Sequence, residues 1–463
     1  MTAADVIGLP GHASTRPWFD RDVQFDHYGA EPLPFGCTGA SGIVQHFVEL
    51  TGGEASRSFD VLDASGGYGS ACLGAGSEVI VTAIAAAVRT AGYVTDEVAS
   101  AERSLLLERL FASGGLFADR FPAADYRVSG RNSGSEGMEL ALRLVLESRF
   151  DRRRLRAVPG AEQRDLVLGF EGAWHGWSGG LLPLLNRRHY RIGLPTIAPE
   201  QFGFRTNHIP FGDLDAAREW FERNGDRVLA VVVEPIQGDA GILVPEQGYL
   251  RELAALAKRS GALLVADEVL TFAKTGRFFA MTDDAGPVPT DITVIGKSLG
   301  MGALSTSMVI ARRELGIRPT GAVATSDLRP LTCAVIRAGL EHIVAEGLLE
   351  RSAVVGAHLG RLLRDRVVAQ FPDLYGEARG VGLIHGIELT DHAAARLGDL
   401  RTAMIRNGVY VEFMSGAGRR SHGLRYLNAT MRVAPPLVAT VDDVESIATR
   451  LAAGSRAVRE AAA

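Results

Sequence analysis

The sequence predicts an α/β fold, in which helices cover both faces of a mostly parallel sheet and a smaller α/β domain follows. Three observations lead to this prediction. Apolar runs such as residues 228–233 (VLAVVV) and 263–266 (LLVA) have the length of strands and no polar face, as is typical of strands buried on both sides. Helix-length segments separate these runs. A long helical stretch, residues 330–346, then leads into a region with a different pattern.

Strands and helices are expected to alternate through the middle of the chain. Residues 79–92 are rich in alanine and are expected to form a helix that ends at Gly92, and a second helix is expected at 101–111. Residues 1 to about 60, with Pro10, Pro17, Pro32 and Pro34, are expected to be irregular. The other expected elements are strands at 127–129, 166–170, 228–233, 263–266, 291–295 and 308–310, and helices with apolar faces at Met138–Val145 and Leu250–Ala257.

Three parts of the chain are expected to fold as units. Residues 1–75 would form an N-terminal segment that contributes to the small domain and to a dimer. Residues 76–344 would form the large domain, and residues 345–463 the small C-terminal α/β domain. The second boundary lies where the long helical stretch ends.

Composition narrows the classes of protein to which the chain can belong. Its 463 residues leave room for two or three domains, and 46% hydrophobic with 22% charged residues is typical of a globular protein. The net charge of −5 gives no basic surplus for binding nucleic acid. No apolar run approaches the roughly 18 residues that span a bilayer, and the N-terminus lacks a secretory pattern. Cys37, Cys72 and Cys333 give no disulfide framework. We therefore expect a cytoplasmic protein without nucleic-acid or membrane partners.

Three ionisable side chains come directly after apolar strands, where ligands collect in open α/β sheets. These are Glu234, Asp267 and Lys297. The carboxyl ends of parallel strands lie along one edge of the sheet, so three such groups in successive strands suggest a common site. A buried lysine is costly in its charged form, so Lys297 needs either a route to solvent or a chemical role.

Two glycine-rich patterns do not match nucleotide-binding motifs. Gly296-Lys297-Ser298 resembles the end of a P-loop, but Asp291 stands where the first glycine of that loop would be. The stretch GGYGSACLGAG, residues 66–76, lacks the G-x-G-x-x-G pattern of dinucleotide-binding proteins. A dinucleotide-dependent oxidoreductase is therefore a poor fit.

A predicted helix N-terminus offers a site for an anion. Ser133 followed three residues later by Glu136 is the pattern of a capping box. Gly134 would allow a ligand to approach closely, and the Ser135 hydroxyl, together with free backbone N–H groups, could bind phosphate. Helix capping alone would also explain Ser133.

Trp174 and His175 follow the strand at 166–170 by a few residues. Trp174 is expected either to pack in the core or to provide a flat surface for a planar ligand. His175 belongs to no HExxH pattern and has no second histidine at ligand spacing, so no metal site is expected.

Together these residues match the needs of pyridoxal phosphate, which requires a lysine for its aldehyde, a carboxylate for its ring nitrogen and an anchor for its phosphate. With residues 233–269 (VEPIQGDAGILVPEQGYLRELAALAKRSGALLVADEV), the chain resembles the class III (ω-amino acid) aminotransferases of fold type I. Within this family it looks like the ornithine- and diaminobutyrate-type enzymes, and the resemblance covers about residues 60–450. The resemblance implies a mostly parallel seven-stranded sheet between helices, a small C-terminal α/β domain, and a homodimer with shared active sites.

The resemblance also assigns roles to individual residues. Lys297 would form a Schiff base with the cofactor, and Asp267 would pair with the protonated ring nitrogen. Thr325 would reach the phosphate bound by the other subunit. Arg432, in MRVAPPL, would bind the α-carboxylate of a substrate, and Glu234 would pair with that arginine and gate it. The implied cofactor-binding residues are Ser133, Gly134, Ser135, Trp174, His175, Asp267, Lys297 and Thr325.

The sequence departs from the family pattern in three places. Leu270 stands where the family usually has a glutamine that bonds the cofactor's phenolic oxygen. Leu328-Arg329 replaces Gly-Asn, and Met301 replaces one glycine of Lys-x-x-Gly-Gly-Gly. None of these changes removes a catalytic group.

The expected activity is amino transfer from an ω-amino acid or amine to a keto acid such as 2-oxoglutarate. An aminomutase, a racemase or epimerase, or a decarboxylase on the same fold would share the cofactor residues and remains an alternative. A non-catalytic protein that binds pyridoxal phosphate is a second alternative, against which the intact Lys297, Asp267 and phosphate set argue.

Overall fold

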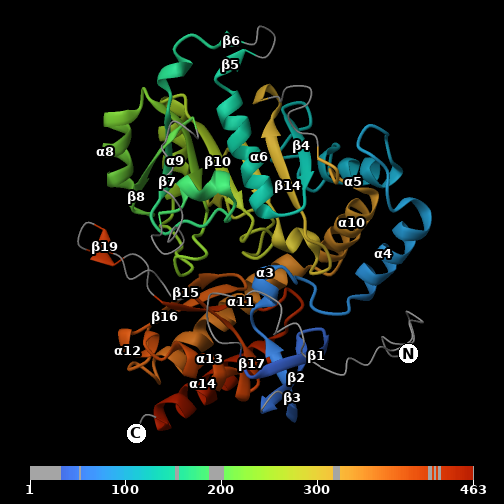
Figure 1. Ribbon diagram of the computed structural model, residues 1–463, viewed down its shortest axis with the longest axis vertical. Helices are drawn as coiled ribbons and strands as arrows, with labels where there is room; N and C mark the ends of the chain where they lie inside the picture. Colours follow the sequence, from blue (N-terminus) through green and yellow to red (C-terminus); the bar gives the residue numbers. More distant parts are fainter. Residues whose placement is uncertain are drawn as a thin grey trace.

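The computed structural model describes residues 33–51, 54–151, 156–186, 203–315, 324–414, 420–421, 424–425 and 429–461. A large sheet with its helices forms the upper part of the molecule in Figure 1, and a smaller group of strands and helices forms the lower part. Within these residues, no helix has the length and apolar character needed to cross a membrane. The same residues contain no cluster of three or more His, Cys, Asp or Glu side chains that could hold a metal ion.

The large sheet has seven strands in the order β4-β14-β13-β10-β9-β7-β8. Strand β14 runs antiparallel to both of its neighbours, and the other printed pairings are parallel. This confirms the mostly parallel sheet predicted from the apolar runs. The strands are β4 (Tyr126–Arg131), β7 (Leu166–Phe170), β8 (Arg205–Ile209), β9 (Val228–Val233), β10 (Leu263–Glu268), β13 (Ile292–Ile295) and β14 (Ser307–Arg312).

Helices cover both faces of this sheet, as alternate residues of each strand show. Val231 and Val233 belong to the core cluster that includes α8 and α9, whereas Ala230 and Val232 pack in the cluster that includes α6. The helices expected at 79–92, 101–111 and 330–346 are confirmed within one or two residues. The helices of this part are α4 (Glu78–Ala91), α5 (Ala101–Phe111), α6 (Gly134–Glu147), α8 (Leu214–Asn224), α9 (Tyr249–Arg259) and α10 (Pro330–Ala345).

The C-terminal region forms a four-stranded sheet, in the order β15-β16-β21-β18, with helices packed around it. Its strands are β15 (Tyr375–Val381), β16 (Ile384–Leu389), β18 (Glu412–Met414) and β21 (Thr430–Val433). Its helices are α11 (Leu348–Leu362), α12 (Asp391–Ala394), α13 (Leu397–Arg406) and α14 (Val441–Glu460). The remaining short elements are α3 (Gly66–Gly69), β5 (Phe150–Asp151), β6 (Arg156–Ala157), η2 (Ala161–Gln163), η3 (Gly179–Leu184), β11 (Thr282–Asp283), β12 (Gly286–Pro287), η5 (Lys297–Gly300), η6 (Arg313–Leu315), η7 (Leu363–Val368), β17 (Val409–Tyr410), β19 (Arg420–Ser421) and β20 (Leu424–Arg425).

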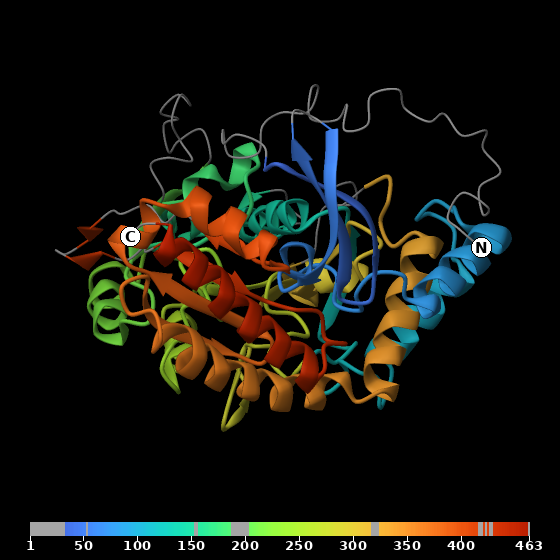
Figure 2. The same ribbon diagram turned by 90° about the horizontal axis from the view of Figure 1, so that it is seen from below.

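The prediction that the chain is irregular up to about residue 60 was wrong from residue 35 onward. Three antiparallel strands, β1 (Phe35–Ser41), β2 (Val44–Thr51) and β3 (Glu54–Asp63), form a sheet there (Figure 2). Strand β3 also pairs in parallel with β17. These strands bury Phe47 and Val61 against Ile405 of α13. The first three prolines lie outside the described residues and Pro34 precedes β1, so none of them interrupts a strand.

Candidate functional site

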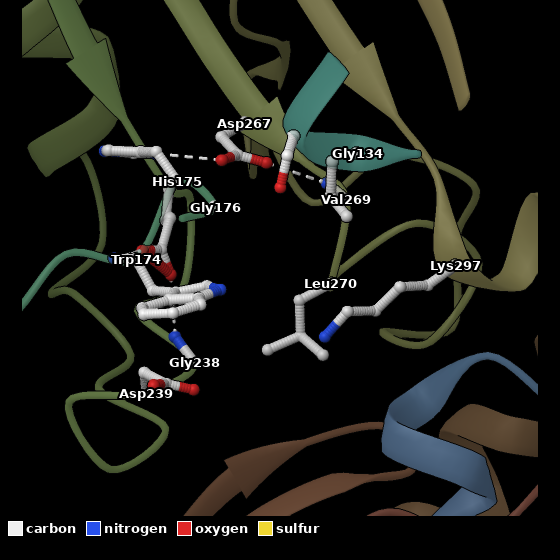
Figure 3. Close-up of a pocket in the computed structure, with 12 residues that line it drawn as sticks. Gly134, Trp174, His175, Gly176, Gly238, Asp239, Asp267, Val269, Leu270 and Lys297 are labelled. Carbon is white, nitrogen blue, oxygen red and sulfur yellow. Dashed lines mark hydrogen bonds and ion pairs between the residues drawn. The ribbon is translucent and has the colours of Figure 1, made fainter. Parts of the chain in front are cut away.

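The carboxyl edge of the large sheet carries most of the residues singled out in the sequence. Parallel pairing places Ala266 opposite Val233 and Asp267 opposite Val294, so Glu234 and Asp267 come at the same level of neighbouring strands. Seven of the expected residues line one cavity of about 160 Å³, with Lys297 and Asp267 extending into it from different sides (Figure 3). The seven are Gly134, Ser135, Trp174, His175, Glu234, Asp267 and Lys297.

Asp267 is held in place by two hydrogen bonds. One oxygen accepts from the backbone N–H of Val269 at 3.1 Å, and the other lies 2.8 Å from Nδ1 of His175. Burial alone would lower the pKa of His175, but the hydrogen bond and charge of Asp267, together with the charge of Glu234, outweigh it and raise the pKa. His175 therefore acts as a partner of Asp267, and its protonated form would stabilise the ionised carboxylate.

In the structure Glu234 bonds backbone groups and Arg432 pairs with another carboxylate, which differs from the predicted gate. Its carboxylate accepts hydrogen bonds from the backbone N–H groups of Trp174, at 2.6 Å, and Gly238, at 2.8 Å. Burial, with a smaller contribution from Asp267, raises the pKa of Glu234 to about 7. The side chain therefore holds the two loops after β7 and β9 together, because it bonds the backbone of each.

Arg432 instead binds Glu412, a residue that the sequence analysis missed. The two residues are direct neighbours across the antiparallel pair β18–β21. Arg432 donates both Nε, at 2.6 Å, and Nη2 to the same oxygen, Oε2 of Glu412. Both side chains are about 95% buried, with 4% and 5% of their surface exposed. Register alone produces this contact, because residues opposite each other in a sheet have adjacent side chains.

Lys297 lies just beyond β13, at the start of the 3₁₀ helix η5. Its backbone is left-handed, with φ of +44°, which is uncommon for a residue other than glycine. Burial, followed by the positive charge of Arg432, lowers the pKa of Lys297 to about 8, although the carboxylates of Glu412, Asp239 and Asp267 act in the opposite direction. The amine is therefore closer to its nucleophilic, uncharged form than an exposed lysine at neutral pH.

Helix α6 begins at one end of the cavity, as the sequence predicted. Ser133 caps the helix by accepting a hydrogen bond from Glu136 N at 3.2 Å. The predicted capping box is not formed, because the Glu136 side chain bonds Asn132 instead. Gly134 and Ser135 line the cavity, whereas Ser133 does not.

Two other expectations concern Thr325 and Leu270. Thr325 is exposed and is not among the residues that line the cavity. Leu270, which stands in place of a glutamine, lines the cavity and packs against Gly238, where an added Cβ would lie 2.1 Å from a Leu270 methyl carbon. A glycine at 238 therefore accommodates the leucine.

The cavity fits pyridoxal phosphate, the group that the sequence resemblance implies. The N-terminus of α6 presents backbone N–H groups and the Ser135 hydroxyl to an anion. An added Cβ at Gly134 would lie 2.7 Å from Val269, and one at Gly176 would lie 2.2 Å from the Ser135 hydroxyl, so both positions need glycine for the site to close. Asp267, Trp174 and Lys297 then offer a carboxylate, a flat ring and an amine around one space (Figure 3).

Comparisons with known proteins agree with this chemistry. The family model for aminotransferase class-III matches residues 56–453. Ornithine aminotransferase from Brevibacillus brevis is 29% identical over 441 residues, which cover 94% of this chain and 96% of that protein. The mitochondrial ornithine aminotransferase of Oryza sativa is 31% identical over 305 residues, 63% of this chain and 61% of that protein.

Solved structures share the fold. Ornithine aminotransferase from Toxoplasma gondii superposes with a TM-score of 0.77 at 23% identity, covering 96% of this chain and 94% of that one. A PLP-bound amine transaminase from an uncultivated Pseudomonas species gives a TM-score of 0.76 at 21% identity, covering 94% and 98%. The family match spans most of the chain, and the cavity holds the matching lysine, carboxylate and helix N-terminus. The chain therefore belongs to the class III aminotransferases and is a transaminase that depends on pyridoxal phosphate.

Proposed function

We propose that this enzyme moves the amino group of an ω-amino acid or amine to a keto acid, with 2-oxoglutarate as the acceptor. One observation carries the proposal most directly. Lys297 and Asp267 extend into one cavity from different sides, and α6 closes a further side of it with its N-terminus. Pyridoxal phosphate, when bound there, supplies an aldehyde carbon for the amino group and a ring that accepts electrons.

Each residue around the cavity then has a defined task. Lys297 would hold the cofactor through its aldehyde carbon, and the free amine of Lys297 would accept the proton from the substrate carbon that bears the amino group and later return it. Asp267 would keep the ring nitrogen protonated, and His175 keeps that carboxylate in place. Gly134 and Ser135 would bind the phosphate at the start of α6, where Ser133 fixes the helix by capping it. Trp174 would stack on the ring.

Arg432 is the natural site for the acceptor's carboxylate, because an arginine fork binds a carboxylate with two parallel hydrogen bonds. Glu412 occupies this arginine in the structure. A keto acid would displace Glu412, whereas a donor that presents only a distal amine would leave the pair intact. Glu412 thus takes the place in the cycle that the sequence analysis gave to Glu234.

The active enzyme is proposed to be a homodimer in which Thr325 completes the phosphate site of the partner. Thr325 is exposed on its own subunit, as this role requires. Apolar side chains are also exposed on and after α4, among them Val81, Val88, Tyr93 and Val98. Such a group is typical of a protein–protein interface.

A panel of amino donors tests the proposal. Purified enzyme is incubated with each donor and 2-oxoglutarate, and glutamate formation is measured. We expect glutamate to form with ω-amino donors and to disappear in Lys297→Ala, while Lys258→Ala, a change at an exposed lysine of α9, keeps the activity. A donor that is isomerised or decarboxylated without any keto acid would instead support the aminomutase, racemase or decarboxylase alternatives.

A further inference from the structure

A second lysine lies beside the one that bonds the cofactor. The chain has only three lysines among its 49 basic residues, Lys258, Lys274 and Lys297. Lys258 is exposed on α9, whereas Lys274 is buried, with only 5% of its surface exposed. A lysine buried to this extent is stable only when its amine is bound by other polar groups.

The partners of Lys274 are both close to the cofactor site. Its Nζ donates to the carbonyl oxygen of Gly69 and to the Oγ of Ser298, the residue that directly follows Lys297. The thiol of Cys72 donates to the carbonyl oxygen of Ser298 at 3.3 Å. Two side chains from different segments therefore hold Ser298, one through its hydroxyl and one through its backbone.

The backbone of Lys297 needs such support. A residue other than glycine with φ of +44° is strained and keeps this conformation only where its surroundings impose it. Gly296 before it imposes no side-chain contact. The carbonyl oxygen of Gly296 accepts from Leu299 N at 3.0 Å, and Ser298 after Lys297 is fixed by the side chains of Lys274 and Cys72, so Lys274 contributes to a constraint on this turn.

The bridge through Lys274 is also connected to the strand that carries Arg432. Gly69 belongs to the left-handed turn Gly66–Gly69, and the segment around this turn is bonded to the region that follows β21. Ala434 N donates to Ala64 O at 2.7 Å, and Leu437 N donates to Cys72 O at 2.8 Å. Arg432 is two residues before Ala434, so one continuous set of bonds joins the Lys297 loop to the strand of Arg432.

We propose that Lys274 is a positioning residue for Lys297: its bridge from Gly69 to Ser298 holds the strained Lys297 backbone so that the Lys297 amine extends into the cavity. Lys274 itself makes no contact with the substrate in this role. The inference rests on the proposed function in one respect, that Lys297 is the lysine that bonds the cofactor.

Two measurements on the cofactor-free protein test the proposal. Pyridoxal phosphate is added, and the rate at which Lys297 Nζ condenses with the aldehyde, with release of one water, is followed by absorbance. Borohydride reduction and peptide mass spectrometry then identify the lysine. Pyridoxamine phosphate, which has no aldehyde, reports binding to the same cavity without any bond to lysine.

We expect Lys274→Met to slow condensation at least tenfold while the dissociation constant for pyridoxamine phosphate changes less than about threefold. Lys258→Met is the matched control and should behave as the wild type. Ser298→Ala should also slow condensation, and the double variant should be no slower than Lys274→Met, because both changes break one bridge.

Other outcomes would overturn the proposal. Condensation at the wild-type rate in Lys274→Met would do so, as would an equal loss of pyridoxamine phosphate affinity, which indicates general support of the fold. If the slowing of condensation in the double variant equals the product of the two single slowings, Lys274 does not act through Ser298. If Lys274→Met does not fold, Ser298→Ala decides, and a wild-type rate in that variant refutes the bridge. A wild-type protein that attaches no cofactor to Lys297 would contradict the proposed function instead.

Discussion

Replacing Glu412 by glutamine should make the enzyme bind keto acids more tightly. In the structure Glu412 occupies Arg432, so a keto acid that binds as proposed would reach the arginine only after the glutamate has left it. The apparent dissociation constant of the acceptor is then raised by the ratio of occupied to free arginine. Glu412→Gln keeps the size of the side chain and removes the charge that competes with the acceptor.

The structure sets the size of this effect. Nε and Nη2 of Arg432 both donate to Oε2 of Glu412, and in the described part of the chain the buried Oε1 has no hydrogen-bond partner. This geometry is weaker than a bidentate pair, in which each carboxylate oxygen accepts one hydrogen bond. For the free energy of the pair we therefore take the lower end of the range for a charge-assisted hydrogen bond, about 1.5 kcal/mol. This corresponds to about tenfold tighter binding of 2-oxoglutarate in Glu412→Gln.

Single-turnover kinetics separate the two halves of the cycle. The acceptor half-reaction should gain about tenfold in apparent affinity, while the donor half-reaction with a distal amine changes less than about threefold. Arg432→Lys should act in the opposite direction, because it loses the fork, and should weaken the acceptor half-reaction by about 1.5–3 kcal/mol. Glu388→Gln is the control, since Glu388 lies on β16 of the same sheet and pairs with Arg379.

Equal changes in both half-reactions would refute this reasoning. Weaker binding of the acceptor in Glu412→Gln would also refute it, because Glu412 would then support the arginine rather than compete for it. Thermal unfolding of each variant checks that the remaining buried charge has not disrupted the sheet, since removing one partner of a buried pair is destabilising.

Four further predictions follow from the site. Borohydride should fix pyridoxal phosphate to Lys297, and an adduct on either of the other two lysines, as found by peptide mass spectrometry, would contradict the assignment. Asp267→Asn should bind the cofactor yet lose nearly all turnover, because an amide does not hold a proton on the ring nitrogen as a carboxylate does, and near-normal turnover would make Asp267 structural. Thr325→Ala should weaken cofactor binding in a dimer, and a fully active monomer in sedimentation at assay concentration would rule out the shared site. In the cofactor-free protein, burial lowers the pKa of Lys297 to about 8 and that of Lys274 to about 7, below the 10.5 of the unfolded chain. The unfolded state therefore binds more protons above pH 7, and the free energy of unfolding should rise toward pH 10 by up to about 1.4 kcal/mol per pH unit for each lysine. Urea unfolding at several pH values measures this slope, which should be smaller in Lys274→Met, and a flat profile would contradict it.

The large sheet and the groups at its carboxyl edge could be predicted because their signals are local. An apolar run long enough for a strand, followed by one ionisable residue, places Glu234, Asp267 and Lys297 without knowledge of any distant contact. Helix α6 was predicted for the same reason, since its cap and apolar face lie within a dozen residues. The partners of these groups were less accessible, because a hydrogen bond such as that of His175 with Asp267 joins positions 92 residues apart.

Lys274 illustrates a different kind of omission. It follows the Asp267 strand by only a few residues, and the chain uses lysine at only three positions, so its rarity was visible in the sequence. The small number of lysines does not, however, indicate which residues the Lys274 side chain contacts. The contact with Ser298 depends on how the loop after β10 folds back, including the left-handed backbone of Ala273.

The choice of Glu412 as the partner of Arg432 depends on strands at the other end of the chain. Residues 409–410 pair in parallel with β3, with Val409 opposite Leu62, and the chain then passes directly into β18. The β3–β17 pairing therefore fixes where the chain enters the second sheet. A slip of one residue there would direct the side chain of residue 412 to the opposite face and leave Arg432 without this partner. The N-terminal strands, which the proline-rich start of the sequence concealed, thus help to determine which carboxylate meets Arg432, the arginine proposed to bind the acceptor.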